Sequence, residues 1–97
     1  MNEIKSVFGQ DFEIALDSKP TAGYKWHPHY DENALQLVSR RVIRESNLTM
    51  VGGAAKEQFV FKPLRAGITT EIRMAYKRPW EGETHYEKEE IFRVNIT

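Results

Sequence analysis

The residues of this chain that could do chemistry are few, and their spacing favours no common reactive site. His27 and His29 are separated by one residue, as two metal ligands on one face of a strand would be. Pro28 lies between them and makes a regular strand unlikely at this point. A third ligand would have to come from His85 or from a carboxylate far along the chain. We therefore expect no metal site and interpret the two histidines as solvated loop residues.

Hydrolytic catalysis is poorly supported as well. The chain has no cysteine, which excludes a thiolate nucleophile, a thiolate metal site and a disulfide scaffold. No serine has an adjacent base or the glycines of a nucleophile elbow. The serines are Ser6, Ser18, Ser39 and Ser46. Glu89 and Glu90 are neighbours on a predicted strand, so they point to opposite faces and cannot share a reaction centre. We expect neither an enzyme nor a cofactor.

A basic cluster at Arg40, Arg41 and Arg44 could contact the phosphates of single-stranded nucleic acid, with aromatic side chains stacking on the bases. However, 14 basic and 14 acidic side chains cancel, so no global field attracts nucleic acid or anionic lipid. Cross-strand pairing of these arginines with an acidic run is the simpler interpretation. That run comprises Glu81, Glu83, Glu87, Glu89 and Glu90. We therefore expect no nucleic-acid partner. No apolar run is long enough to span a bilayer, so we expect no membrane partner either.

The elements that must position any site are strands. Apolar residues alternate with polar ones over 12–16, 68–76 and 92–96, the pattern of half-buried strands. Further strands are predicted around Phe59 and Phe61, from Tyr24 and Trp26 onward, and as one or two segments within 35–43, while only 31–37 could form a helical turn. Six to eight short strands separated by glycine and proline turns predict an all-β fold, an antiparallel β-sandwich. The predicted core is Phe12, Ile14, Trp26, Phe59, Ile72, Met74, Phe92 and Val94.

Ninety-seven residues are enough for one hydrophobic core, and no linker or repeat divides them, so we expect one domain over 1–97 and a monomer. The first ten residues, MNEIKSVFGQ, lack the apolar centre of a signal peptide. As written, the chain is expected to be cytoplasmic, or secreted or periplasmic if a leader has been removed.

Three turn segments carry more than turn chemistry. The first is Lys19-Pro20-Thr21-Ala22-Gly23, a proline-stiffened tip followed at once by the aromatic Tyr24. The second contains Met50, Val51, Gly52, Gly53 and Ala54, where consecutive glycines let a partner approach the backbone closely. The third is Tyr76-Lys77-Arg78-Pro79-Trp80-Glu81, which contains tryptophan and arginine, the two residue types most enriched at binding hot spots. In a seven-stranded Greek-key sandwich, the loops in these three places can lie at one end.

These residues resemble the chagasin-like family of inhibitors of papain-type cysteine peptidases. The shared pattern extends over nearly the whole chain, and its most specific parts are Pro20-Thr21-Ala22-Gly23-Tyr24-x-Trp26 and Tyr76-x-Arg78-Pro79-Trp80-Glu81. Between them lies the Gly52-Gly53 pair with Phe59 behind it, and the apolar alternations at Phe12, Ile14, Leu16 and at Phe92, Val94, Ile96 flank the whole. The chain departs from the family at Lys19, Ala22 and Met50, where asparagine, threonine and glycine are usual.

The resemblance implies an immunoglobulin-like sandwich whose three loops enter the cleft of a papain-like, cathepsin L-type peptidase. It places Thr21 nearest the catalytic thiolate, the glycine-rich loop along the non-primed subsites and Trp80 on the primed side. Inhibition would be reversible and non-covalent. The implied contact residues are Lys19, Pro20, Thr21, Ala22, Gly23, Tyr24, Met50, Val51, Gly52, Gly53, Ala54, Arg78, Pro79, Trp80 and Glu81. The alternative is an immunoglobulin-like adhesion or ligand-binding module with an unrelated partner.

Overall fold

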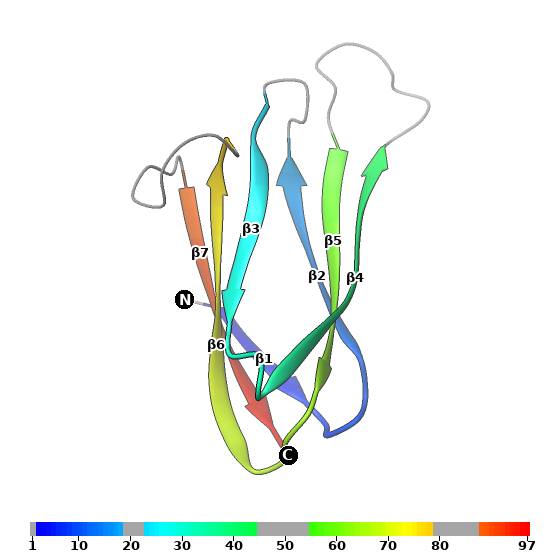
Figure 1. Ribbon diagram of the computed structural model, residues 1–97, viewed down its shortest axis with the longest axis vertical. Coiled ribbons are helices and arrows are strands. Elements are labelled where there is room, and N and C mark those ends of the chain that lie inside the picture. Colours follow the sequence, from blue (N-terminus) through cyan, green and yellow to red (C-terminus); the bar gives the residue numbers. More distant parts are fainter. Residues whose placement is uncertain (1, 19–22, 45–54, 79–87) are drawn as a thin grey trace.

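The computed structural model describes residues 2–18, 23–44, 55–78 and 88–97, and within them the chain forms seven strands (Figure 1). The strands are β1 (Asn2–Ser6), β2 (Phe12–Ser18), β3 (Lys25–Tyr30), β4 (Leu35–Arg44), β5 (Ala55–Pro63), β6 (Ile68–Lys77) and β7 (Lys88–Ile96). No helix in these segments is long and apolar enough to cross a membrane.

The strands form two sheets, with the orders β1-β7-β6-β3 and β2-β5-β4. All pairs are antiparallel except β1 with β7, which run parallel from Asn2 opposite Phe92 to Ser6 opposite Ile96. The predicted all-β sandwich is thus confirmed. β1 was not predicted, because its sequence NEIKS presents a single large apolar side chain, Ile4, to the core.

The core lies between the two sheets and is made by the same-parity residues of each strand. Of the residues predicted to be buried, Phe12 is only half-buried and packs against the rest, whereas the others are confirmed as core residues. The core is completed by residues that were not in the prediction, namely Ala34, Leu35, Phe61, Tyr76 and Ile96. Phe61, Tyr76 and Ile96 have the inward parity of strands that were predicted, so they extend the same faces.

The expectation that Pro28 interrupts a strand was wrong. β3 runs through it, with Pro28 opposite Met74 of β6. β3 is the last strand in the order of its sheet. A proline, which has no backbone N–H to donate, is tolerated on such an edge strand. His27 and His29 therefore lie in a strand rather than in a loop.

The predicted helical turn is confined to the first residues of its segment. The backbone N–H groups of Ala34 and Leu35 both donate to the carbonyl of Asp31 at 3.0 Å, and the chain then enters β4. β4 is one continuous strand with a register shift between Leu37 and Ser39, so Val38 is an extra residue on the β4 side of the ladder.

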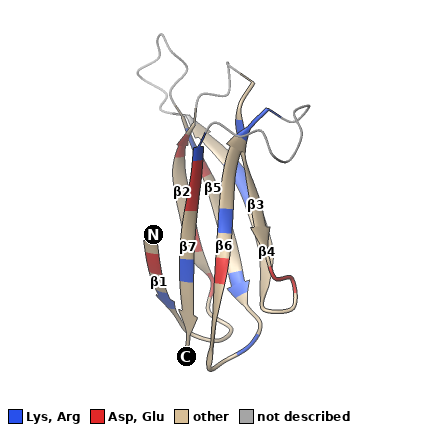
Figure 2. Cartoon of the chain, turned by 90° about the vertical axis from the view of Figure 1, so that its left-hand side faces the viewer, with Lys and Arg blue, Asp and Glu red and all other residues tan. Residues whose placement is uncertain are grey.

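The predicted pairing of the arginine cluster with the acidic run was wrong where the structure describes it. Arg40 Nη2 lies 3.5 Å from Glu57 Oε1, and Arg41 Nε donates a hydrogen bond to Gln58 Oε1 at 2.7 Å. The reason is topological: β4 and β7 belong to different sheets. Glu89 of β7 instead pairs with Arg73 of the adjacent β6 at 2.9 Å. Figure 2 shows acidic and basic residues interspersed along β6 and β7, so this side of the molecule carries no field of a single sign.

Candidate functional site

The strand ends that border the three predicted loops lie at one end of the sandwich (Figure 1). In one sheet, Ala55 at the start of β5 is opposite both Ser18, which ends β2, and Arg44, which ends β4. In the other sheet, Lys25 at the start of β3 is opposite Lys77, which ends β6. Lys88, which begins β7, is opposite Tyr76 of β6. The β2–β3, β4–β5 and β6–β7 connections therefore all start and finish at this end.

Three of the predicted contact residues fall within the described segments, namely Gly23, Tyr24 and Arg78. The others lie outside the described residues and stay predictions: Lys19, Pro20, Thr21, Ala22, Met50, Val51, Gly52, Gly53, Ala54, Pro79, Trp80 and Glu81. The structure thus describes the strand ends and adjoining residues from which the predicted loops emerge, which we call the loop roots.

Gly23, two residues before the start of β3, has a backbone φ of 85°. This is the left-handed region, which glycine adopts without steric cost and residues with a Cβ rarely adopt. The glycine of the Pro-Thr-Ala-Gly-Tyr motif is therefore required by the backbone, which turns at this point before Tyr24.

An aromatic stack joins the roots of the first and third predicted loops. The ring of Tyr24 stacks on that of Tyr76 with centroids 5.3 Å apart, and Trp26 lies 4.7 Å from Tyr76 by the same measure. Arg78 places its guanidinium carbon 4.7 Å from the centre of the Tyr24 ring. Lys88 Nζ lies 5.4 Å from the centre of the Tyr76 ring. Cation–π contacts of this kind are favourable, so β3, β6 and β7 are linked through side chains just below the loops.

A buried carboxylate joins the roots of the first and second predicted loops. Glu57 is 2% exposed and accepts a 2.7 Å hydrogen bond from Ser18 Oγ. The backbone N–H of Trp26 lies 3.3 Å from each of its oxygens, and Arg40 supplies the opposite charge at 3.5 Å. Arg40 also donates to the carbonyl of Trp26 at 2.7 Å. The indole N–H of Trp26 donates in turn to the carbonyl of Asp17 at 2.9 Å.

Sequence reasoning missed Glu57, although a signal was present. β5 alternates buried and less buried residues, and Glu57 has the same parity as Ala55, Phe59 and Phe61, all of which are buried. An acidic residue on the inward face of a predicted strand needs hydrogen-bond partners, since burial of an unpaired charge is very costly. That parity marks Glu57 as the centre of a polar network.

Among the described residues, His27 is a titratable group whose pKa is clearly shifted. Burial is the largest cause that lowers the pKa of His27 from its ordinary value of 6.5, and the positive charges of Arg40 and Lys77 lower it further. A hydrogen bond with the backbone of Lys77 and the charge of Glu57 act in the opposite direction. Within the described part of the chain, Nε2 of His27 is buried without a hydrogen-bond partner. The neutral imidazole is therefore the favoured form here.

The chemistry of this end is that of a rigid support. Across residues 2–18, 23–44, 55–78 and 88–97, no three histidine, aspartate or glutamate side chains gather closely enough to hold a metal ion. The Glu57 carboxylate instead binds a serine hydroxyl, an arginine and a backbone N–H, and the aromatic rings pack on one another. Such an arrangement holds neighbouring segments in place.

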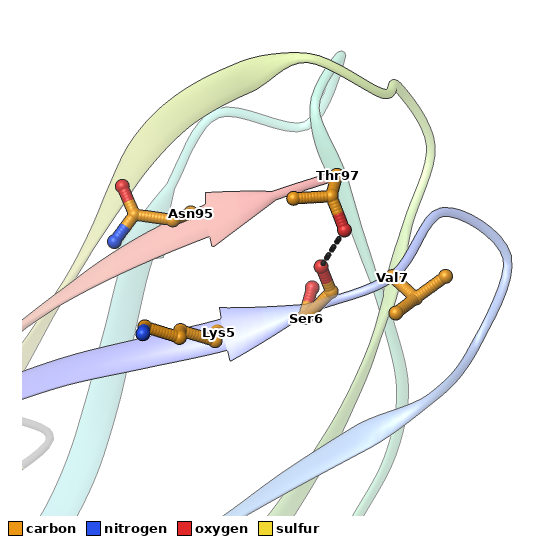
Figure 3. A pocket seen from close by; sticks show the side chains of 5 residues that line it. All are labelled: Lys5, Ser6, Val7, Asn95 and Thr97. Carbon is orange, nitrogen blue, oxygen red and sulfur yellow. Dashed lines mark hydrogen bonds between the residues drawn. The ribbon is translucent and has the colours of Figure 1, made fainter.

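A shallow hollow of about 390 Å³ lies at the opposite end of the sandwich, where the parallel strands β1 and β7 finish (Figure 3). Its lining residues are Lys5, Ser6, Val7, Asn95 and Thr97. Thr97 Oγ1 donates to the carbonyl of Ser6 at 3.3 Å. Lys5 is the one titratable side chain among the five, so the hollow offers no acid–base pair and we do not assign the function to it.

Comparisons with known proteins agree with this architecture. The sequence profile of the chagasin family peptidase inhibitors, I42, matches residues 6–96. Amoebiasin-2 of Entamoeba histolytica is 33% identical over 75 residues, which are 76% of this chain and 60% of that protein. The chain thus spans about 60% of the length of this curated relative.

Two solved structures are similar to the chain over almost its whole length. The crystal structure of the cysteine protease inhibitor EhICP2 from Entamoeba histolytica has a TM-score of 0.85 at 28% identity and is similar over 99% of this chain and 86% of its own. The solution structure of Amebosin has a TM-score of 0.75 at 22% identity, over 98% and 88% respectively, which is a likeness of fold alone.

Proposed function

This chain belongs to the chagasin family of peptidase inhibitors, and from that membership we propose that it is a reversible, non-covalent inhibitor of papain-like cysteine peptidases. The class of target is supported by EhICP2, a cysteine protease inhibitor with the same fold. Within this class we propose cathepsin L-type enzymes as partners of the monomeric domain.

One observation carries the proposal: the strand ends that border the three predicted loops share one end of the sandwich. Residues 19–22, 45–54 and 79–87 connect these strand ends and contain most of the predicted contact residues. We propose that they enter the peptidase cleft together, with Thr21 over the catalytic cysteine and histidine and Trp80 on the primed side.

The contacts below the loops support tight binding. The Tyr24–Tyr76 stack and the Glu57 network hold both ends of the first loop before any partner arrives. Ordering a flexible side chain at an interface costs about 0.5–1.5 kcal/mol, and a root that is already ordered avoids this cost. More of the contact free energy is then available for affinity.

Inhibition in this proposal is steric. The chain has no cysteine to form a mixed disulfide with the catalytic thiol. The inhibitor therefore prevents substrate from entering the cleft by occupying it, and activity returns when the complex dissociates.

The test is a titration of papain and of cathepsin L with the purified domain, and trypsin and thermolysin serve as controls. We expect competitive inhibition of the two cysteine peptidases that reverses on dilution, with no inhibition of the controls. Equal potency against trypsin or thermolysin would contradict the proposed specificity. A domain that leaves papain and cathepsin L fully active would favour an immunoglobulin-like adhesion or ligand-binding module.

A further inference from the structure

The two ends of the first predicted loop are fastened to the same side chain. Ser18 is the last residue of β2 in the three-stranded sheet, and Trp26 is the second residue of β3 in the four-stranded sheet. The hydroxyl of Ser18 and the backbone N–H of Trp26 both donate to the carboxylate of Glu57, at 2.7 Å and 3.3 Å. Glu57, on β5 of the three-stranded sheet, thus accepts hydrogen bonds from one strand of each sheet.

The position of Glu57 is costly for a charged residue. Its side chain is 3% exposed, and it lies on the face of β5 that also carries Phe59. A buried ion pair is often no more stabilising than apolar side chains of similar volume would be. A contribution to the free energy of unfolding is therefore not a sufficient reason for the Arg40–Glu57 pair to be buried here. The carboxylate instead fixes the relative position of two strands, because its two oxygens accept hydrogen bonds from donors on both of them.

Arg40 extends the same network. It donates to the carbonyl of Trp26 while its guanidinium lies beside Glu57 and 5.1 Å from the centre of the Phe59 ring. Trp26 is therefore held at its N–H, at its carbonyl and at its indole N–H, the last by Asp17. These contacts fix the separation between Ser18 and Trp26.

We propose that Glu57 is a positioning residue of the inhibitor, and we name Glu57, Ser18, Trp26 and Arg40 the carboxylate clasp. This inference rests on the proposed function and deepens it. With its ends fastened, the connection from Ser18 to Trp26 should lose conformational freedom and resist the extended form that a peptidase hydrolyses. The clasp thus keeps the loop an inhibitor and prevents it from becoming a substrate.

The main variant is Glu57→Gln, and the second is Ser18→Ala. A glutamine has one acceptor oxygen in place of two and carries no charge for Arg40, so it cannot serve both strands as the carboxylate does. Ser18→Ala removes one donor and leaves Glu57 paired with Arg40 and Trp26. This variant should therefore stay folded and keep the proposal testable even if Glu57→Gln unfolds.

Two control variants separate positioning from stability. Glu13→Gln is the same substitution on β2, where Glu13 is exposed and accepts a surface hydrogen bond from Gln58. Val94→Ala opens a cavity at a fully buried position of β7 and lowers the melting temperature without touching the clasp.

The first measurement is amide hydrogen exchange of residues 19–25 in the free domain. For Glu57→Gln we expect amide exchange in this segment to be at least about tenfold faster, the lower bound for the loss of one charge-assisted hydrogen bond. Ser18→Ala should act in the same direction. The two controls should leave local exchange in this segment as in the wild type, even where Val94→Ala melts earlier.

The second measurement is the inhibition constant for papain, followed by mass spectrometry of the inhibitor after prolonged incubation. The clasp variants should inhibit about tenfold more weakly, by the same argument, and should be cut between Ser18 and Trp26. The controls should remain intact. Unchanged exchange in both clasp variants, whatever their melting temperatures, overturns the proposal, and so does faster exchange with unaltered inhibition and no cut.

Failure of the proposed function gives a different result. In that case the wild-type domain itself does not inhibit papain or cathepsin L, whereas the exchange measurement on the free domain still shows whether Glu57 fixes the segment.

Discussion

Tyr24 stacks on Tyr76 with ring centroids 5.3 Å apart and ring planes inclined by 23°. Tyr24 immediately precedes β3, and Tyr76 is the last residue but one of β6. The contact therefore links the chain that leaves the first predicted loop to the chain that enters the third. The position of one loop root is therefore coupled to that of the other through the contact between these two rings.

Tyr24→Ala should weaken inhibition of papain more than Tyr24→Phe does. The alanine variant loses the stack on Tyr76 and the contact with Arg78, whereas phenylalanine keeps both. An aromatic pair contributes about 0.5–1.5 kcal/mol beyond its buried area, so a loss of roughly twofold to tenfold in affinity is expected for alanine. Inhibition constants for the two variants measure this. Equal constants for Tyr24→Ala and the wild type would remove the stack from the binding argument.

Trp80→Ala should weaken inhibition and leave the melting temperature nearly unchanged. Pro79 before it fixes its own φ near −65° and removes a backbone donor, so we expect the tryptophan to be displayed beyond the β6 ladder. Truncation of a hot-spot tryptophan costs about 2 kcal/mol or more, which is roughly thirtyfold in affinity. The inhibition constant and the thermal melt are measured on the same preparation. A large fall in melting temperature would reassign Trp80 to the core, and unchanged inhibition would remove it from the interface.

Thr21→Ala should be tolerated far better than Thr21→Trp. If the tip of the first loop contacts the catalytic cysteine and histidine, alanine removes few atoms, whereas tryptophan would hold the tip out of the cleft. The comparison requires the inhibition constants of both variants for papain. Identical values would mean that Thr21 lies away from the active site of the peptidase.

The free energy of unfolding should fall as the pH drops below about 6.5, in part through His27. The folded protein lowers the pKa of His27, so over this range the unfolded chain binds more protons at that position than the folded one does. The loss begins near 6.5, the ordinary value, and ends once the pH is below the folded pKa. Acid therefore favours unfolding.

Thermal melts between pH 7.5 and pH 5 check this. His27→Gln should have a shallower pH dependence than the wild type, because glutamine does not titrate. His29→Gln, which removes the other imidazole of β3, serves as the matched control. A pH dependence of His27→Gln that coincides with that of the wild type would show that His27 contributes nothing to it.

The sequence predicted those strands whose register is visible locally. Alternation at Phe12, Ile14 and Leu16 marks an inward face without reference to any other segment. β1 is different, because NEIKS becomes a strand only through pairing with β7, about ninety residues away in the chain. Pro28 misled the prediction for a similar reason, since its tolerance depends on β3 being an edge strand, which is a property of the sheet order.

The common end of the strands that border the three loops was predicted, whereas the side-chain contacts below the loops were not. Turn composition and the family pattern located the three loops between β2 and β3, β4 and β5, and β6 and β7, where the strand ends confirm a common end. The inward parity of Glu57 was visible in the sequence, but its partners in the clasp were not, because the members come from four strands and both sheets. A lone glutamate in a sequence is ordinarily read as solvated until its donors are known.

The parallel pairing of β1 with β7 has a mechanical consequence. Asn2 begins one strand and Thr97 follows the end of the other, and the two strands run in the same direction across five paired positions. Tension applied between these two residues pulls the strands past each other along their length. The interstrand hydrogen bonds then bear the load together and must break together, whereas in a hairpin pulled open from its ends they break one after another. A domain tethered at residues 2 and 97 would therefore resist stretching, and in a force-extension experiment it should yield in one high-force step.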